Sequence, residues 1–184
     1  MRVISGTARG KKLLSLEGLD TRPTTDRVKE SVFNIIMSYV RDAAVLDAFA
    51  GSGALGIEAL SRGAVHCTFV EKSRAALEVL RKNLEGTRLS DKAAVRQADA
   101  LEFLRAERGT FDLIFLDPPY DGGLYGPVME LIAERGLLSA DGVLVVEKRA
   151  ETVLAVPDGL TYIKERKYGK TAIAVYTSRK EDAI

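Results

Sequence analysis

The sequence predicts an α/β fold, with a doubly wound, mostly parallel sheet and an antiparallel C-terminal hairpin at one edge. Three observations predict it. Strand-like and helix-like stretches alternate through the middle of the chain. A glycine-rich turn, 51–53, directly follows the first strand-like stretch. Two strand-like runs near the C-terminus are joined through Gly169-Lys170, which is typical of a hairpin.

Short apolar runs bounded by turn signals indicate the strands, and amphipathic periodicity indicates the helices. The expected strands lie near residues 44–49, 65–70, 93–98, 111–116 and 142–148, with hairpin strands at 160–167 and 171–178. The expected helices lie near residues 54–62, 73–86, 99–107 and 124–135. An earlier helix is expected to open between Arg22 and Arg27, capped by Thr24 or Thr25.

The composition is that of a globular chain, with 184 residues, 46% of them hydrophobic and 29% charged. We expect one domain over residues 1–184, with residues 1–22 as a basic N-terminal extension. No apolar stretch could span a bilayer, and no signal region opens the chain, so a cytoplasmic monomer is expected. A single cysteine excludes an internal disulfide, and no spacing of ligand residues indicates a metal site.

Basic side chains are concentrated near both ends of the chain. The first 29 residues hold seven basic and three acidic residues, although the whole chain has a net charge of only +1. A second basic cluster near the C-terminus comprises Lys164, Arg166, Lys167 and Lys170. Such clusters either form solvated faces or bind phosphates, since contacts to a nucleic-acid backbone need cations. The N-terminal candidates for phosphate contact are Arg9, Lys11, Lys12 and Arg22.

The tetrapeptide Asp117-Pro118-Pro119-Tyr120 follows the apolar run 111–116. Neither proline can donate a backbone N–H to a sheet, and each fixes φ, so the predicted strand ends in a stiff loop. This loop lies at the carboxyl end of a strand, where open α/β sheets bind ligands. It offers a carboxylate, free backbone carbonyls and an aromatic ring, which together suit a planar base with an exocyclic amine.

The turn after the first strand has the spacing of a nucleotide-binding loop. Gly51, Gly53 and Gly56 fit the pattern G-x-G-x-x-G between a strand and a helix. Glu71 ends the second strand 20 residues after Gly51, and a carboxylate there can accept both hydroxyls of a ribose. A nucleoside-containing cofactor is therefore expected, the alternative being a tight turn that serves packing alone.

Two further carboxylates follow predicted strands. Asp47 precedes the glycine loop, where a carboxylate suits a cofactor with an amino acid moiety and a cation; alternatively it ties the loop by backbone hydrogen bonds. Asp99 follows the third strand and either caps the next helix or also accepts a hydrogen bond from an adenine amine.

The sequence resembles the class I S-adenosylmethionine-dependent methyltransferases, which have a Rossmann-like fold. The residues that carry the resemblance occur in the same order as in that family, and they are Asp47 to Gly56, Glu71, Asp99 and the Asp117–Tyr120 loop. The Asp-Pro-Pro-Tyr form resembles the subset that methylates exocyclic amines of nucleobases. Further similarity, to the bacterial 16S rRNA guanine-N2 methyltransferases acting at guanine 966, lies in residues 2–6, 9–13, 22–30 and 58–64. The resemblance covers nearly the whole chain.

The resemblance implies S-adenosylmethionine as cofactor and 16S rRNA as substrate, within an assembly intermediate of the small subunit. The implied cofactor-binding residues are Asp47, Ala50, Gly51, Ser52, Gly53, Glu71, Lys72, Asp99 and Ala100, with Thr25 and Arg27 closing over the cofactor from the other side. The implied target-base residues are Asp117, Pro118, Pro119 and Tyr120.

Other functions remain open from the residues alone. The tetrapeptide also suits adenine N6 or cytosine N4 in DNA or RNA. An NAD-dependent oxidoreductase would use Gly51 to Gly56 and Glu71, but it leaves the tetrapeptide unexplained. A non-catalytic RNA-binding assembly factor would be expected to have a broken loop, and both loops are intact. Cys67 falls inside a predicted strand, which argues against a cysteine nucleophile for pyrimidine carbon-5 methylation.

Overall fold

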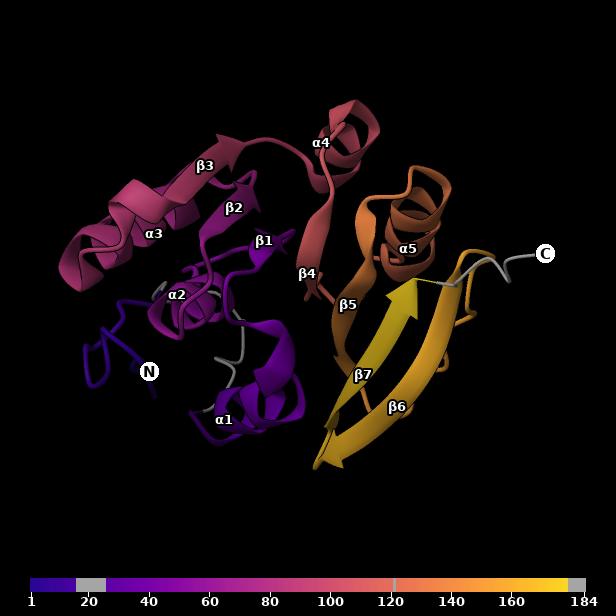
Figure 1. Ribbon diagram of the computed structural model, residues 1–184, viewed down its shortest axis with the longest axis horizontal. Coiled ribbons are helices and arrows are strands. Elements are labelled where there is room, and N and C mark those ends of the chain that lie inside the picture. The colour runs from indigo at the N-terminus through magenta and orange to yellow at the C-terminus, as the bar shows by residue number, and fades with distance from the viewer. Residues whose placement is uncertain (16–25, 121, 179–184) are drawn as a thin grey trace.

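A computed structural model describes residues 1–15, 26–120 and 122–178, which are built around one seven-stranded sheet (Figure 1). The strand order is β3-β2-β1-β4-β5-β7-β6. The strands are β1 (Ala44–Asp47), β2 (His66–Glu71), β3 (Ala93–Gln97), β4 (Phe111–Leu116), β5 (Leu138–Arg149), β6 (Leu160–Tyr168) and β7 (Thr171–Ser178). Strands β1 to β5 pair in parallel, and β7 pairs antiparallel with β5 and β6. The predicted fold class is confirmed.

Helices cover both faces of the sheet (Figure 1). The first face is covered by α1 (Asp26–Ile35), α2 (Ala54–Ser61) and α3 (Arg74–Thr87), and we call it the α1 face. The second is covered by α4 (Ala100–Ala106) and α5 (Tyr125–Glu134), and we call it the α5 face. Short 3₁₀ turns occupy Met37–Tyr39 and Ser90–Lys92. The expected caps Thr24 and Thr25 lie outside the described residues. No helix in the described ranges has the length and apolarity needed to cross a membrane.

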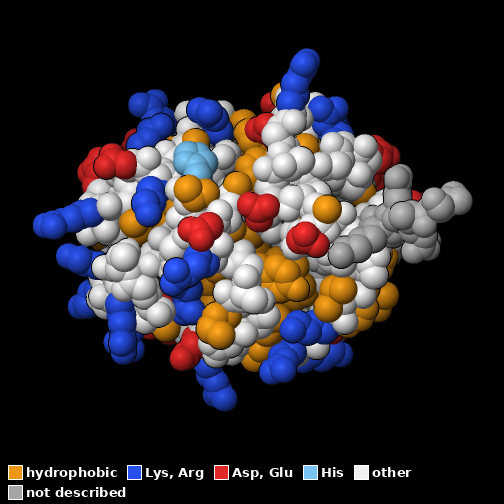
Figure 2. All heavy atoms as spheres, in the orientation of Figure 1, with side chains coloured by type: hydrophobic (Ala, Val, Ile, Leu, Met, Phe, Trp, Pro, Cys, Tyr) orange, Lys and Arg blue, Asp and Glu red, His pale blue; other side chains and the backbone are white. Residues whose placement is uncertain are grey.

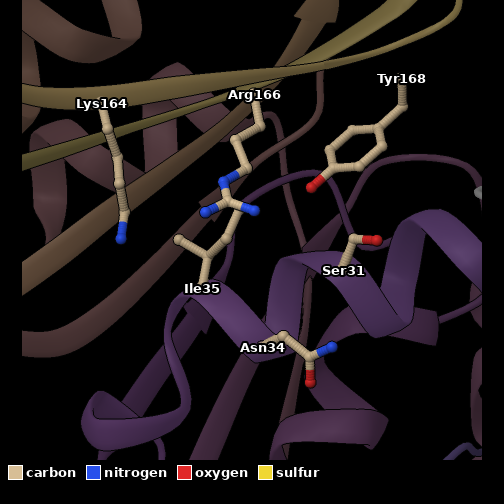
Figure 3. A pocket seen from close by; sticks show the side chains of 6 residues that line it. All are labelled: Ser31, Asn34, Ile35, Lys164, Arg166 and Tyr168. Carbon is tan, nitrogen blue, oxygen red and sulfur yellow. The ribbon is translucent and has the colours of Figure 1, made fainter.

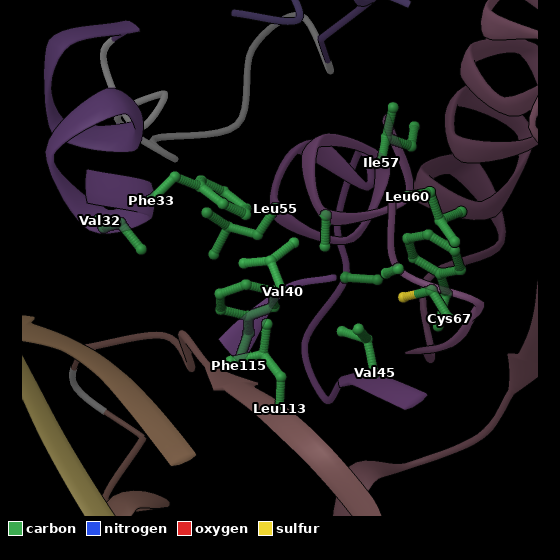
Figure 4. Packing of buried hydrophobic residues seen from close by; sticks show 14 of the residues in the cluster. Val32, Phe33, Val40, Val45, Leu55, Ile57, Leu60, Cys67, Leu113 and Phe115 are labelled. Carbon is green, nitrogen blue, oxygen red and sulfur yellow. The ribbon is translucent and has the colours of Figure 1, made fainter. Parts of the chain in front are cut away.

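The alternation of side chains along each strand divides the core into two layers. On the α1 face, Phe33 of α1 packs on Phe115 of β4, with ring centroids 5.7 Å apart (Figure 4). Cys67 lies in the same layer and is fully buried, as expected for a core residue. On the α5 face, the even-numbered residues of β4 pack with Val128 and Ile132. Burial on both faces explains why the parallel strands read as continuous apolar runs.

A buried carboxylate attaches the N-terminal segment to α1 and α2. Glu58 of α2 is fully buried and accepts hydrogen bonds from the backbone N–H groups of Ile4 (2.8 Å) and Ser5 (3.0 Å). The same carboxylate pairs with Lys29 of α1 (3.1 Å) and with Arg62 (2.8 Å). Lys29 is also fully buried, so its ammonium group depends on this pairing and on the carbonyl of Arg2 (2.6 Å).

Strand β5 is longer than predicted. The sequence predicted a strand near residues 142–148, whereas β5 begins at Leu138. The pairing register with β4 shifts between Phe111 and Leu113, so the additional residues form an irregularity within the strand. The Ser139 hydroxyl stabilises it by donating to a carboxylate oxygen of Asp112 at 2.8 Å.

We expect Gly56→Ala to lower the free energy of unfolding by about 1–3 kcal/mol, because α2 packs too closely on β2 for a larger residue. An added Cβ would lie 2.3 Å from Phe69 Cε1 and 2.7 Å from Cys67 Sγ. Urea unfolding measures the change. Gly86→Ala in α3 is the control, since its Cβ would meet nothing within 4 Å, and it should be neutral or stabilising. Equal effects of the two substitutions would contradict the packing argument.

Candidate active site

Three carboxylates gather at the carboxyl ends of the neighbouring strands β1, β4 and β5. Asp47 of β1 pairs with Phe115 of β4, and Leu116 of β4 pairs with Val146 of β5. Asp117 directly follows Leu116, and Glu147 directly follows Val146, so both lie at the same edge as Asp47. Asp47 and Glu147 are only 3% and 7% exposed, and Asp117 is partly buried. The parallel topology therefore concentrates acidic groups at one edge of the sheet.

Burial and mutual repulsion disfavour the ionised forms of these acids. The pKa of Asp47 is raised to about 7, mainly by burial and to a lesser extent by the Glu71 carboxylate, against the lowering effect of the hydrogen bond from Gly56. Burial also raises the pKa of Asp117 well above its usual range, and the carboxylates of Glu147 and Asp47 add to this. A ligand that brings positive charge or N–H donors would restore the ionised forms, so the cluster favours such ligands.

The three glycines of the loop have different neighbours. Gly53 is the N-cap of α2 at φ 82°, and a Cβ there would lie 2.2 Å from Leu80 Cδ1. Gly56 packs equally closely against β2 and donates its N–H to Asp47 Oδ2 at 3.0 Å. Gly51 has φ 52°, yet its Cβ direction is open. Gly53 and Gly56 thus serve packing, while Gly51 leaves room for a ligand against the backbone.

Glu71 fixes the loop and still has acceptor capacity. One carboxylate oxygen accepts from the Gly51 N–H at 2.9 Å, and the other accepts from the Ser73 N–H at 2.7 Å. Each oxygen has a second lone pair, which can accept a ligand hydroxyl. The Ala50 N–H donates to the Val70 carbonyl at 3.0 Å, which ties the loop directly to β2.

Asp99 lies at the end of β3, on the side of β2 away from β1. Its carboxylate caps α4 by accepting from the Leu101 N–H at 2.9 Å, which is the capping role considered from the sequence. The exposed Lys72 ammonium is 4.0 Å from its second oxygen. Ala100, the first residue of α4, is buried beside it. The ends of β1, β2 and β3 therefore bring the predicted cofactor residues between Asp47 and Ala100 to one edge of the sheet.

Asn83 is a site residue that the sequence did not predict. Its amide N–H₂ group donates to the Ser52 carbonyl (2.8 Å) and to the Leu14 carbonyl (3.0 Å), and its Oδ1 accepts from the Leu14 N–H (2.8 Å). It thereby joins the glycine loop to the N-terminal segment. The sequence feature that could have indicated Asn83 is its position as a polar residue within the apolar stripe of α3, beside Leu80 and Leu84.

Glu147 is the second such residue, and it contacts the Asp117–Tyr120 loop. It accepts from the Tyr120 hydroxyl at 3.5 Å, and its backbone carbonyl accepts from the Tyr125 hydroxyl at 2.9 Å. The Arg149 guanidinium lies over the Tyr120 ring, 5.3 Å from its centroid. Pro118 is buried and Pro119 is exposed. The available signal for Glu147 was an acidic residue directly after the apolar run 143–146.

The remaining predicted residues lie on the surface or outside the described ranges. Arg9, Lys11 and Lys12 are exposed on the N-terminal segment, which folds back on itself through the Val3 N–H to Lys11 carbonyl bond (2.9 Å). Arg27 is exposed on α1. Arg22 and Thr25 lie outside the described residues.

Several solved structures with this fold are named as methyltransferases. The crystal structure described as "Putative methyltransferase yhhF from Escherichia coli" is 39% identical to this chain, with a TM-score of 0.87. The match covers 98% of this chain and 99% of that one. The fold and the site therefore define a class I methyltransferase, and S-adenosylmethionine is its expected cofactor.

Sequence comparison identifies the family within this class. Residues 1–177 match the family described as "Conserved hypothetical protein 95", and the chain belongs to it. "Putative rRNA methyltransferase YlbH" of Bacillus subtilis is 44% identical over 97% of this chain and 100% of its own length. "Ribosomal RNA small subunit methyltransferase D" of Escherichia coli is 40% identical over 96% of this chain and 89% of its own length.

We expect Asp47→Asn to stabilise the protein in a pH-dependent way. The folded-state pKa of Asp47, about 7, is raised above the usual value of 3.8, so ionisation favours the unfolded chain. The wild-type protein therefore loses stability relative to the variant as pH rises from about 4 to about 7, by at most about 4 kcal/mol. Urea unfolding of both proteins at pH 4.5, 6 and 8 measures the difference. A difference that does not change with pH would contradict the assignment.

Proposed function

We propose that this protein transfers a methyl group from S-adenosylmethionine to the exocyclic N2 amine of a guanine in 16S rRNA. The observation that carries the proposal is the Asp117–Tyr120 loop, which stands at the end of β4 beside the glycine loop and within the carboxylate cluster. The names of the relatives support small-subunit rRNA as the substrate. We further propose that the protein acts as a monomer, as one domain over residues 1–184, on an assembly intermediate of the small subunit.

The cofactor would lie across the ends of β1, β2 and β3. The open side of Gly51 and the loop from Ala50 to Gly53 would contact its amino acid part, with Asp47 favouring the positive charge. The free lone pairs of Glu71 would accept the ribose hydroxyls, and Asp99 with Ala100 would border the adenine. When bound, S-adenosylmethionine supplies an electrophilic methyl group on a positively charged sulfur.

Asp117 and Pro118 would activate the acceptor by position and electrostatics. An exocyclic guanine amine is a poor nucleophile, because its lone pair is delocalised into the ring. The Asp117 carboxylate and the Pro118 carbonyl would accept its two N–H bonds, which favours a pyramidal nitrogen with its lone pair facing the methyl group. Positive charge then develops on nitrogen beside the carboxylates of Asp117 and Glu147, which stabilise it.

Tyr120 would hold the base in this orientation. Its hydroxyl donates to Glu147, one ring face is covered by Arg149, and the ring also packs on the core of the α5 face, so the part of the ring left exposed would be the stacking surface. Stacking of a base on an aromatic ring contributes about 1–3 kcal/mol in nucleic-acid binding. The base must first leave its stack or belong to an unpaired loop.

The choice of guanine N2 at position 966 rests on the residues that resemble the guanine-N2 family. Two of these stretches, 2–6 and 58–64, contact each other through Glu58. Adenine N6 and cytosine N4 are the competing acceptors. Transfer of labelled methyl groups to 16S rRNA and small subunits from a strain lacking this protein, followed by nucleoside mapping, separates them. We expect N2-methylguanosine, and a methylated adenosine or cytidine in its place would overturn the proposal.

We expect Asp117→Asn to lower the rate of methyl transfer by about 100-fold or more, since it removes the charge that stabilises the developing cation. Binding of S-adenosylhomocysteine, measured by calorimetry, should be largely retained. Asp158→Asn removes one exposed carboxylate elsewhere and should leave the rate unchanged. A fully active Asp117→Asn enzyme would refute the mechanism.

We expect Lys11→Glu with Lys12→Glu to weaken RNA binding and to reduce its dependence on salt. Each phosphate contact of a single strand contributes about 0.7 to the slope of log K against log salt. Filter binding at several salt concentrations measures this slope. The matched control is Lys92→Glu with Arg108→Glu, which reverses two exposed positive charges elsewhere. If the two double variants bind alike, the N-terminal segment is only a solvated face.

A further inference from the structure

We propose that the pocket between α1 and β6 binds a backbone phosphate of the RNA strand that flanks the target nucleotide. This inference rests on the proposed function and extends it to a second contact with the same substrate. The pocket has a volume of about 180 Å³ and is lined by Ser31, Asn34, Ile35, Lys164, Arg166 and Tyr168 (Figure 3). Sites for drug-sized ligands measure roughly 300–1,000 Å³, so this one suits a single group such as a phosphate.

The chemistry of the lining is that of an anion site. Lys164, Arg166 and Tyr168 extend from β6 towards α1, which contributes Ser31, Asn34 and Ile35 to the lining (Figure 3). The six lining residues include two cations and no carboxylate. Asn34 adds an amide donor and Tyr168 adds a hydroxyl, whereas the Ser31 hydroxyl already donates to the Arg27 carbonyl at 2.9 Å. A guanidinium beside an ammonium, with neutral donors around them, matches the oxygens of a phosphodiester.

The acidic residue within this part of β6 does not neutralise the pocket. The Glu165 side chain lies on the α5 face of the sheet, where its carboxylate pairs with the Lys148 ammonium at 2.8 Å. Side chains on one strand alternate between faces, so Lys164 and Arg166 share the α1 face while Glu165 and Lys167 do not. Lys and Arg side chains are visible along the lower edge of the molecule, where Figure 1 places α1 and the end of β6 (Figure 2). The positive charge of the pocket is therefore available to a ligand.

The pairing register connects the pocket to the candidate active site. Arg149 of β5 pairs with Thr171 of β7, which pairs with Tyr168 of β6. The three share the α1 face, and Arg149 lies over the Tyr120 ring. The Thr171 side chain also hydrogen-bonds Tyr120. Two strand spacings, about 10 Å in total, separate Arg149 from Tyr168. An RNA strand with its target base on Tyr120 can therefore reach the pocket with a neighbouring phosphate.

The test combines Lys164→Gln with Arg166→Gln. We expect RNA binding to weaken about tenfold and the slope of log K against log salt to fall by about 0.7, as for one lost single-strand phosphate contact. In methyl transfer, the KM for RNA should rise about tenfold while kcat stays unchanged. Binding of S-adenosylhomocysteine should not change, which also shows that the variant is folded. Lys164→Arg with Arg166→Lys keeps both charges and should restore most of the RNA affinity.

Lys167→Gln with Arg105→Gln is the matched control, because it removes two exposed positive charges on the α5 side. Equal losses in both double variants, or no loss in either, would overturn the phosphate site while wild-type methyl transfer still supports the proposed function. A loss confined to protein-bearing subunits, with unchanged binding of naked rRNA, would assign the pocket to a protein and also overturn it. Absence of methyl transfer by the wild-type protein would instead refute the proposed function.

Discussion

The buried carboxylate of Glu58 is the interaction on which the arrangement of the functional surfaces depends. It accepts from two backbone N–H groups of the N-terminal segment and pairs with the ammonium of Lys29 in α1 and the guanidinium of Arg62, the C-cap of α2. Removing one partner of a buried ion pair costs about 3–5 kcal/mol, because the other charge stays buried. The helix that carries Glu58 begins at the glycine loop, and α1 forms one wall of the pocket that Lys164 and Arg166 line. The glycine loop, the basic N-terminal segment and this pocket therefore all depend on Glu58.

The candidate active site has the opposite electrostatic character. At the ends of β1, β4 and β5, burial raises the pKa of Asp47 and Asp117, and the neighbouring acids raise these values further. Such a cluster destabilises the protein without a ligand, whereas a cationic cofactor and an amine substrate relieve the repulsion. The fold therefore places negative charge where the proposed reaction develops positive charge, and it places Lys164 and Arg166 where the RNA backbone would pass.

Local patterns in the sequence predicted the parts of this arrangement that are themselves local. The strand that ends at Asp117, the glycine turn and the capping position of Asp99 follow from a few consecutive residues. Glu147, Asn83 and Glu58 could not be assigned in the same way, because their partners lie on other elements and depend on register and helix packing. The start of β5 at Leu138 is a similar case, since it depends on a contact between Ser139 and Asp112 of another strand. Gly51, Gly53 and Gly56 are equivalent in the sequence pattern, and their different roles could be assigned only from their neighbours in the structure.

The central claim is that Asp117 and Pro118 present the two acceptors that orient the target amine. A crystal structure of the protein with S-adenosylhomocysteine and a guanine-containing RNA fragment tests it most directly. We expect the guanine N2 atom within about 3.2 Å of both the Asp117 carboxylate and the Pro118 carbonyl, with the base on the Tyr120 ring. A complex in which the N2 amine points away from both acceptors, with the base bound elsewhere, would contradict the claim.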